Sequence, residues 1–532
     1  GLHLLFLHPD IAITQPNWIH ALLKHGQRPE VGVVGGKQLY GDGTVRHAGY
    51  LLGVNGVAGE AFFGVNNSHK SYMGRLHVDQ NYSAVSGDML LVNKEVFDAV
   101  QGFDESLDAF WDVDFCLRVR EKGWLTVWTP SVEVLRSVSS KVSETPAEVT
   151  ARNEKQQQDE SVLYSRWMPI LVNDPASNVN LSLSSEHAMV CPDSLLSWRP
   201  LDWSPLPVVL PHMGDYAGCG YYRIIKPFEA MRDAAIVDGK LSETFLSVPY
   251  LERYKPDSII LQRQITAEFH EWASRVGELT NIFKVFELDD YLPNIPIKNH
   301  HRSDFGKDIM KMLRKSLSYM DRFVVSTQPL ADAFSDMHRD IVVMPNRLSH
   351  DWWGNVVSLR EQGRKPRVGW AGGSSHTGDL EMIAGVIQAF ADEVEWVFFG
   401  MCPEKIRPYV TEMHYGVDIE LYPQKLASLN LDLALAPVED NFFNACKSNL
   451  RLLEYGACGI PVICSDVACY QGFKHVTRVR NRYKEWHEAI RYHLDNPSQS
   501  EQMGRELQRY VHRDWMLDSD NAAIWAKAWL PD

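Results

Sequence analysis

Two charged side chains in the C-terminal part of the chain, Lys447 and Glu454, have types and spacing that suit phosphate and sugar binding. They lie seven residues apart, so on a helix both would project from one face. A cation in the first helical turn, together with the helix dipole, favours a phosphate, and a carboxylate further along suits sugar hydroxyls. The same spacing fits an ordinary amphipathic helix with a solvated face, and on its own it does not choose between the two.

The stretch around these two residues predicts a helix, a glycine turn and a buried strand. Apolar side chains recur at helical spacing at Leu450 and Leu453. Gly459 stands where a C-terminal cap glycine belongs, and Pro461 follows where a helix cannot continue. Residues 460–464 form a short apolar run that predicts the strand. Because this stretch follows several predicted parallel strands, the helix should begin at the carboxyl edge of a sheet.

A second possible phosphate site follows the predicted strand 367–370. Small and polar residues precede a predicted helix there, and they are Gly372, Gly373, Ser374 and His376. Glycines and hydroxyls at a helix N-terminus form a cradle whose backbone N–H groups suit a diphosphate. This second cradle strengthens the prediction that Lys447 and Glu454 belong to a phosphate site.

A glycine-bearing loop between residues 211 and 224 leads from a predicted strand into a predicted helix. Gly218 and Gly220 allow the backbone to approach a ligand closely, and Arg223 would sit in the first turn of the helix. A lone glycine-rich loop is a weak signal, because an ordinary strand-to-helix turn accounts for it as well.

Charged residues end two further predicted strands, 257–261 and 281–287. Arg263 follows the first strand, and the pair Asp289 and Asp290 follows the second. Ligands of open α/β sheets bind beyond the carboxyl ends of the strands, so we expect these side chains near a cleft. The paired carboxylates could take a hydroxyl proton or bind sugar hydroxyls, or they could simply cap a helix.

In the first 200 residues the main catalytic candidate is Asp112, which lies at the start of a predicted amphipathic helix. A carboxylate in this place could act as a general base that deprotonates an acceptor hydroxyl. Carboxylates just ahead of helices are also common N-cap residues, and that alternative stays open.

The composition bounds the class of protein and its partners. A length of 532 residues predicts several domains, and a net charge of −15 makes nucleic acid an unlikely general partner. The basic run at residues 474–484 is expected to be a solvated face, with at most peripheral contact to anionic lipid.

The cysteines and the apolar runs indicate a cytoplasmic protein, at most peripheral to the inner face of the membrane. The eight cysteines form no CxxC pair, which favours reduced structural thiols. No apolar run approaches the ~18–20 residues of a membrane span, and there is no signal peptide. The chain opens directly in an apolar strand, so we expect it to be a fragment of a longer polypeptide. The sequence does not indicate an oligomeric state.

The order of predicted elements divides the chain into five parts. They are a partial α/β domain with a helical tail at 1–195, a linker at 196–207, one α/β lobe at 208–350, a second lobe at 365–500, and C-terminal helices at 501–532 that could cross back onto the first lobe. Alternating strand and helix signals predict parallel sheets, including a strand at 418–421. Residues 145–158 are expected to be a helix or hinge.

Four motifs follow in order through the first part of the chain, LLFLHPDI, VGVVGGKQLYGDGTVRHAGYLLG, SGDMLLVNKEVFDAVQGFDE and DVDFCLRVREKGW. In this order they resemble the C-terminal half of inverting, family-2-type GT-A glycosyltransferases. The resemblance implies that Asp10 helps to hold a divalent metal, Mg or Mn, and that Asp112 is the catalytic base. The family often places a His pair after the VWTP strand, where this chain has Arg136 and Ser137.

The later motifs are GCGYYRIIKP, FELDDYLP, MPN, RVGWAGGSSHTGDL, LDLALAP and KSNLRLLEYGACGIPVICSD. Together they resemble GT-B glycosyltransferases of the retaining, family-4 type, in which two Rossmann-like lobes face each other. The resemblance implies a UDP- or GDP-type sugar donor on the C-terminal lobe, with Glu454 on the ribose and Lys447 on the diphosphate. It implies that Asp289 and Asp290, on the N-terminal lobe, receive a glycan or lipid-linked glycan acceptor.

The remaining donor-site candidates belong to the same motifs. They are Gly218, Gly220, Arg223, Arg263, Gly372, Gly373, Ser374, His376 and Asn449. The family commonly carries a second Glu eight residues before the one matched by Glu454, and here that position is Cys446. Asp440, Asn441 or Asn444 would substitute for it.

These features predict an α/β protein of GT-B architecture that transfers a hexose from a nucleotide sugar in cell-surface polysaccharide biosynthesis. No metal is needed at such a site, because backbone amides and a cation neutralise the leaving diphosphate. The alternatives are an inverting, metal-dependent activity that uses Asp112, and a non-catalytic sugar-nucleotide-binding or assembly module. A Rossmann dehydrogenase is disfavoured, because no GxGxxG is followed by an acidic residue about 20 positions on.

Overall fold

The computed structural model divides the chain into two compact units. It describes residues 1–137, 145–191, 203–294, 308–359, 364–373 and 376–532. The first unit consists of Gly1–Trp203, Phe245–Lys255 and Arg275–Asn281, and the second of Ser204–Thr244, Pro256–Ser274 and Ile282–Asp532. Two short segments expected in the lobe at 208–350 therefore cluster with the first unit. Most of the expected linker, residues 196–202, lies outside the described residues.

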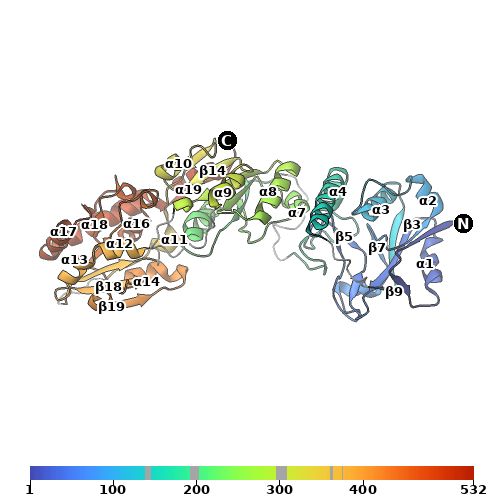
Figure 1. Ribbon diagram of the computed structural model, residues 1–532, viewed down its shortest axis with the longest axis horizontal. Helices are drawn as coiled ribbons and strands as arrows, with labels where there is room; N and C mark the ends of the chain where they lie inside the picture. Colours follow the sequence, from blue (N-terminus) through green and yellow to red (C-terminus); the bar gives the residue numbers. More distant parts are fainter. Residues whose placement is uncertain (138–144, 192–202, 295–307, 360–363, 374–375) are drawn as a thin grey trace. The chain divides into compact units, whose positions relative to one another are not determined.

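The first unit is built on a seven-stranded mixed sheet (Figure 1). Its main path runs β1 (His3–Leu7), β8 (Met89–Asn93), β3 (Val31–Leu39), β9 (Leu125–Arg136) and β2 (Ile11–Ile13), with β4 (Val45–His47) beside β3 and β7 (Gln80–Tyr82) beside β9. The strand predicted at 31–34 is confirmed and continues through Gly35 and Gly36. Glycine is required at these two positions, because the side chains of Val85 and Met89 fill the space where a Cβ would stand.

This unit also contains helices α1 (Trp18–Gly26), α2 (Lys94–Ala99), α3 (Trp111–Glu121), α4 (Pro146–Val172) and α7 (Val248–Tyr254), and a two-stranded sheet of β5 (Tyr50–Leu52) and β6 (Ala58–Glu60). The segment 145–158, expected as a helix or hinge, is the beginning of α4. Thr145 and Glu148 form a reciprocal capping box there, and Pro146 occupies the first turn, where its missing N–H costs nothing.

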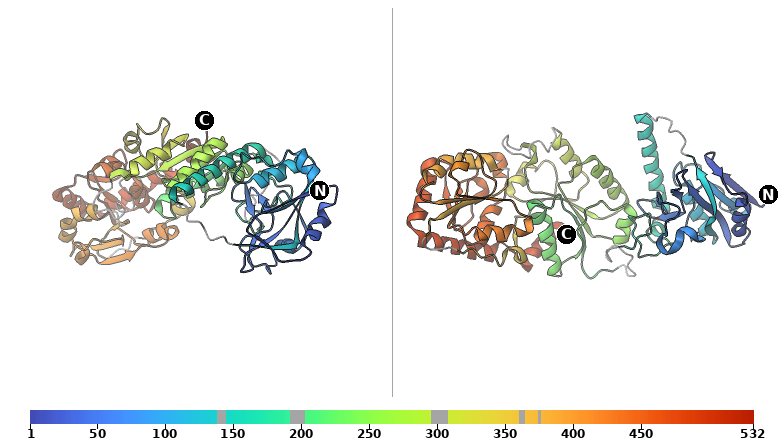
Figure 2. Two further views of the ribbon diagram at one scale, coloured as in Figure 1. Left: turned by 45° about the vertical axis from the view of Figure 1, so that its right-hand side comes forward. Right: turned by 90° about the horizontal axis from the view of Figure 1, so that it is seen from below.

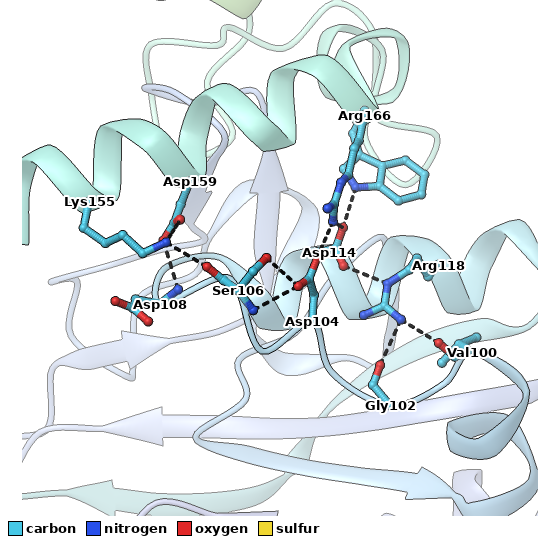
Figure 3. Close-up of polar contacts among 11 residues, drawn as sticks. Val100, Gly102, Asp104, Ser106, Asp108, Asp114, Arg118, Lys155, Asp159 and Arg166 are labelled. Carbon is cyan, nitrogen blue, oxygen red and sulfur yellow. Dashed lines mark hydrogen bonds and ion pairs between the residues drawn. The ribbon is translucent and has the colours of Figure 1, made fainter.

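Buried carboxylates attach α4 to α3 and to the loop before it (Figure 3). Asp114, fully buried, accepts hydrogen bonds from Arg118 Nε at 2.7 Å and Trp167 Nε1 at 2.9 Å. Asp159 accepts from the backbone N–H groups of Asp108 and Ala109, both at 2.9 Å. These contacts with α4 fix the beginning of α3, where Asp112 lies.

The N-terminal lobe of the second unit contains a six-stranded, fully parallel sheet. Its order is β11 (Asp238–Gly239), β10 (Val208–His212), β12 (Ser258–Gln262), β13 (Phe283–Leu288), β14 (Arg322–Val325) and β15 (Ile341–Val343). The C-terminal helix α19 (Ser519–Trp529) packs on α6 (Lys226–Asp233) and adds Trp525 and Trp529 to the core of this lobe.

The C-terminal lobe contains a second six-stranded parallel sheet. Its order is β19 (Glu412–Tyr415), β18 (Glu395–Gly400), β17 (Arg367–Ala371), β20 (Leu433–Ala436), β21 (Val462–Ser465) and β22 (Thr477–Val479). Numbered along the chain, this is the order 3-2-1-4-5-6 of a doubly wound Rossmann sheet. The prediction of two Rossmann-like lobes is therefore confirmed.

Two helical layers cover the C-terminal sheet (Figures 1 and 2), and alternate residues of its strands pack against one layer or the other. Val397 and Phe399 pack with α16 (Leu450–Ala457) and α18 (Pro497–Asp514). Trp396 and Phe398, one residue out of step, pack with α13 (Ala384–Ala389) and α17 (Tyr483–Asp495). This burial on both faces explains why the strands read as continuous apolar runs.

The strand predicted at 418–421 is wrong. Residues Ile419–Leu421 form a 3-10 turn that leads into α14 (Tyr422–Ser428), and Pro423 in the first turn of that helix favours this entry. The edge strand is instead β19, where Glu412 accepts two hydrogen bonds from Arg367 of β17.

A fully buried ion pair joins several elements of the second unit. Arg223 Nε lies 2.5 Å from Glu287 Oε1 of β13, and both side chains are 0% exposed. The same guanidinium donates to the carbonyl of Met344 at 2.6 Å and to Asn346 Oδ1 at 2.8 Å, and it lies over the ring of Trp525. Arg223 is therefore a structural residue of the N-terminal lobe.

Arg223→Met should lower the free energy of unfolding of the second unit by about 3–5 kcal/mol, because it leaves Glu287 as an uncompensated buried charge. Urea denaturation measures this loss. The double variant Arg223→Met/Glu287→Leu should recover most of the stability, and the exposed Arg232→Met should behave like the wild type. A double variant as unstable as Arg223→Met would contradict this account.

Candidate active site

A cavity of about 630 Å³ lies in the second unit, within the size range of small-molecule sites. Both lobes line it. The N-terminal lobe contributes Gly218, Cys219, Tyr222, Asp289, Asp290 and Asn346. The predicted residues that the C-terminal lobe contributes are Gly372, Gly373, His376, Lys447 and Glu454. The structure thus brings candidates from four separate motifs to one cavity.

The topology of the C-terminal sheet explains where this wall lies. The strand order reverses between β17 and β20, and ligands of such sheets bind at this switch point. Gly372 follows β17 directly, and a Cβ there would lie 2.6 Å from Arg451 Nη2 and 2.7 Å from the Trp370 ring. Glycine thus allows Arg451 to approach the loop backbone. Ser374 lies outside the described residues.

The helix that carries the predicted charged pair starts later than expected. The predicted helix, glycine turn and strand are present, as α16, Gly459 with φ of +68°, and β21. However, α16 begins at Leu450, so Lys447 lies in the preceding turn and not on the helix. Lys447 and Glu454 both line the cavity nonetheless, because that turn stays at the sheet edge.

Arg451 is a second cation in this wall that the sequence analysis missed. It is half-buried and lies over the ring of Trp370, 4.9 Å from its centroid. A signal was present, since Arg451 lies four residues after Lys447 and three before Glu454. Lys447 and Arg451 together supply two positive charges to this side of the cavity.

Both oxygens of the Glu454 carboxylate accept hydrogen bonds from tyrosine hydroxyls. Tyr222 donates to Oε1 at 2.8 Å, and Tyr422 donates to Oε2 at 3.1 Å. Burial raises the pKa of Glu454 to about 7, although these hydrogen bonds and Arg451 act in the opposite direction. No sequence pattern links Tyr222 to a residue 232 positions away, so sequence reasoning missed both tyrosines.

His376 is held by a buried carboxylate. Its Nδ1 lies 2.7 Å from Asp379 Oδ2, while Asp379 Oδ1 accepts from the Glu439 N–H at 2.7 Å. Burial lowers the pKa of His376 well below its usual value, and Arg451 and Lys447 lower it further. The neutral ring therefore donates through Nδ1 to Asp379.

The N-terminal wall carries the acidic candidates. Asp289 and Asp290 line the cavity beside Cys219, and burial raises the pKa of the Cys219 thiol well above its usual value, with a further contribution from Asp289. The Cys219 sulfur and one carboxylate oxygen each of Asp289 and Asp290 lie within 4.8 Å of one another. Among the residues that the structure describes, they form the group that could hold a metal ion.

Four donor-binding candidates do not reach the cavity wall. Arg223 is buried in its pair with Glu287, and Arg263 forms an ion pair with Asp215. Gly220 is a tight packing position, since a Cβ there would overlap the Asp215 carbonyl. The fourth candidate, Asn449, is only half-buried at the start of α16.

The residues expected to replace the second Glu of the family also stay off the cavity wall. Asn441 caps α15 (Phe442–Ala445) by accepting from the N–H of Asn444. Asn444 is buried and donates to the Glu439 carbonyl at 3.0 Å, and Asp440 is exposed. Cys446 is buried, and its carbonyl accepts from Thr327 Oγ1 of the N-terminal lobe at 2.7 Å.

In the first unit, Asp112 lies in the first turn of α3 and is 7% exposed. It accepts from the Gly87 N–H at 2.8 Å, the Val113 N–H at 2.9 Å and the Tyr50 hydroxyl at 3.3 Å. Burial raises the pKa of Asp112 to about 6, against the effect of these hydrogen bonds. The preceding Phe110 occupies the N-cap position, so Asp112 is not the N-cap residue.

Asp10, the expected metal ligand, faces a fixed cation. Arg136 Nη2 lies 3.8 Å from Asp10, and Arg136 Nη1 lies 3.6 Å from Asp88. His8 Nε2 is 3.3 Å from the same guanidinium. The residues around Asp10 therefore do not fit a divalent cation, because Arg136 already supplies positive charge between the carboxylates.

The burial of His376 leads to a prediction about its protonation. In histidine-labelled protein, the imidazole signal that disappears in His376→Gln should keep the chemical shift of a neutral ring from pH 8 down to pH 5. The reason is that burial, Arg451 and Lys447 all disfavour the charged ring. NMR titration measures it, and a midpoint at or above 6.5 would contradict the geometry described above.

Comparison with known proteins finds a family model that matches residues 411–524. This segment matches the family model described as "Glycosyl transferase-like". The chain is also 31% identical over 191 residues to the O-antigen biosynthesis protein RfbC of Myxococcus xanthus, covering 35% of this chain and 14% of that protein. It is 39% identical over 180 residues to an uncharacterised protein of Sinorhizobium fredii, covering 33% of this chain and 20% of that one.

A third relative is the N-acetylglucosaminyl-diphospho-decaprenol L-rhamnosyltransferase of Mycobacterium tuberculosis, 39% identical over 72 residues, which are 13% of this chain and 24% of that protein. The chain thus spans less than a quarter of the length of these curated relatives. Sucrose-phosphate synthase of Thermosynechococcus elongatus is a similar solved structure, with 13% identity, a TM-score of 0.45 and coverage of 60% of this chain and 98% of that chain. Lys447, Arg451 and Glu454 lie within the segment that matches the glycosyl transferase-like family model.

Proposed function

We propose that the second unit transfers a sugar from a nucleotide diphosphate donor to a glycan acceptor, with the reaction in the cavity between its lobes. One observation carries the proposal. A single cavity has two cations, a glycine pair and a carboxylate on one wall, and two aspartates on the other. This division suits an anionic donor on one side and a hydroxyl-bearing acceptor on the other.

The C-terminal wall has the chemistry that a leaving diphosphate needs. Lys447 and Arg451 supply two positive charges against the two charges of the diphosphate, and the space beside Gly373, where a Cβ would stand, is open to a ligand. Such fixed cations and N–H groups stabilise developing negative charge without a metal ion. We therefore propose a metal-independent reaction at this site.

Glu454 would bind the ribose of the donor. Each carboxylate oxygen has more than one acceptor site, so an oxygen that already accepts from a tyrosine can accept from a sugar hydroxyl as well. The acceptor would approach Asp289 and Asp290, where a carboxylate can bind an attacking hydroxyl or take its proton. The donor nucleotide would be of the UDP or GDP type.

The relatives support a role in cell-surface polysaccharide synthesis. One is described as an O-antigen biosynthesis protein, and another acts on a lipid-linked acceptor by its printed name. A lipid-linked glycan acceptor would bring the protein to the inner face of the membrane, at most peripherally. Within the described residues, every helix is too short or too polar to span a bilayer. None of the eight cysteines, all of which the structure describes, forms a disulfide, which fits a reducing cytoplasm.

Asp112 favours a second candidate, an inverting transfer in the first unit. A buried carboxylate with a pKa of about 6 has the properties of a general base near neutral pH. A metal-dependent form of this reaction is disfavoured, because Arg136 already pairs with Asp10 and Asp88.

Calorimetry with UDP- and GDP-sugars, with and without EDTA, tests the two candidates. At the proposed site, binding should survive EDTA and weaken about 10- to 100-fold in Lys447→Met, because a charge-assisted contact is worth roughly 1.5–3 kcal/mol. Glu454→Ala should weaken binding in the same way, and the matched variant Asp112→Ala should not.

Two results would overturn the proposal. Binding that is lost with EDTA or in Asp10→Ala, but kept in Lys447→Met, would move the chemistry to the first unit. Binding of neither nucleotide sugar by the full chain would favour an assembly module without a donor site.

A further inference from the structure

The two hydrogen bonds to Glu454 come from different lobes. Tyr422 begins α14 on the same lobe as Glu454, whereas Tyr222 belongs to the connection between β10 and α6 on the N-terminal lobe. Tyr222 is 3% exposed and packs against Trp352 with ring centroids 5.0 Å apart. The N-terminal lobe therefore contributes a fixed hydroxyl to the carboxylate that we propose binds the donor ribose.

A π-helical turn at Tyr221–Ile225 places two consecutive tyrosines against the C-terminal lobe. Tyr222 donates to the buried Glu454 at 2.8 Å, and Tyr221 donates to the exposed Glu420 at 2.9 Å. Of these four residues, Tyr222 and Glu454 line the cavity. Such turns occur often at functional sites, where the extra residue redirects side chains.

Further contacts fix the position of Tyr222 relative to Glu454. Arg223, next along the same turn, donates to Asn346 Oδ1, and Asn346 Nδ2 donates to Ser448 Oγ at 2.9 Å. Ser448 lies two residues before α16, the helix that carries Glu454. The position of Tyr222 relative to Glu454 is thus set by a buried ion pair and not only by its own hydrogen bond.

The groups that face Glu454 decide its charge. They are the hydroxyls of Tyr222 and Tyr422, which donate to it, and the Arg451 guanidinium, while Tyr455 and Cys458 interact with it only electrostatically. Burial favours the neutral acid, and the Tyr222 hydrogen bond is the largest of the effects that favour the carboxylate. Removing this hydroxyl would therefore raise the pKa of Glu454 above about 7.

We propose that Tyr222 is a positioning residue of the donor site, which orients the Glu454 carboxylate toward the ribose hydroxyls from the opposite lobe. This inference rests on the proposed function, because it needs a nucleotide in the cavity. It adds that donor binding depends on the N-terminal lobe, even though the cations and the carboxylate lie on the C-terminal lobe.

The test measures UDP and GDP binding by the full chain between pH 6 and pH 9 in the wild type, Tyr222→Phe and Tyr221→Phe. Loss of a hydrogen bond to a charged group, worth roughly 1.5–3 kcal/mol, should weaken binding by Tyr222→Phe about 10- to 100-fold at pH 7. Binding should recover as the pH rises, because the carboxylate then forms despite its raised pKa. Tyr221→Phe removes an equivalent contact between the lobes and should retain the wild-type pH profile.

A second substitution tests the same hydroxyl without removing it. 3-Fluorotyrosine at position 222 keeps the ring and makes the hydroxyl a stronger donor, so the pH midpoint of binding should move down and not up. A pH profile unchanged in both Tyr222 variants would overturn the inference, even if Tyr222→Phe lowers stability. Failure of the wild type to bind either nucleotide would instead overturn the proposed function, and this inference with it.

Discussion

The buried guanidinium of Arg223 is the contact on which the second unit most depends. It pairs with Glu287 of β13, lies over the ring of Trp525 from α19, and donates to Asn346, whose amide donates to Ser448 of the other lobe. Elements from the beginning, middle and end of the unit thus converge on one charge. An unpaired buried charge is costly, so Arg223 has few other positions that would keep its charge paired. Through Asn346 it therefore fixes the position of one lobe relative to the other around the cavity.

The residues predicted from local pattern and sheet topology are mostly those that line the cavity. Gly372, Gly373 and His376 follow β17, and Asp289 and Asp290 follow β13, so the rule on carboxyl strand ends located them. The two Rossmann-like lobes were predictable for the same reason, since buried parallel strands read as distinct apolar runs. The strand predicted at 418–421 was wrong because four residues that alternate between charged and apolar are too few to distinguish a strand from a turn.

What the sequence could not indicate are contacts between distant positions. Arg223 has the type and place of a phosphate ligand, and only the proximity of Glu287 reveals it as a structural residue. Tyr222 and Tyr422 become meaningful only because the folded lobes place both beside Glu454. Likewise, Asp10 was expected to hold a metal ion, and the contact with Arg136 that argues against this is formed across the sheet of the first unit.

The central claim is that one cavity, with walls from both lobes, binds the nucleotide sugar. Hydrogen–deuterium exchange of the full chain, with and without saturating nucleotide sugar, tests it most directly. The account predicts slower exchange on both walls, at residues 218–222 and at residues 447–454, with no change around Asp10 and Asp112. Protection confined to the segments around Asp10 and Asp112 would contradict it.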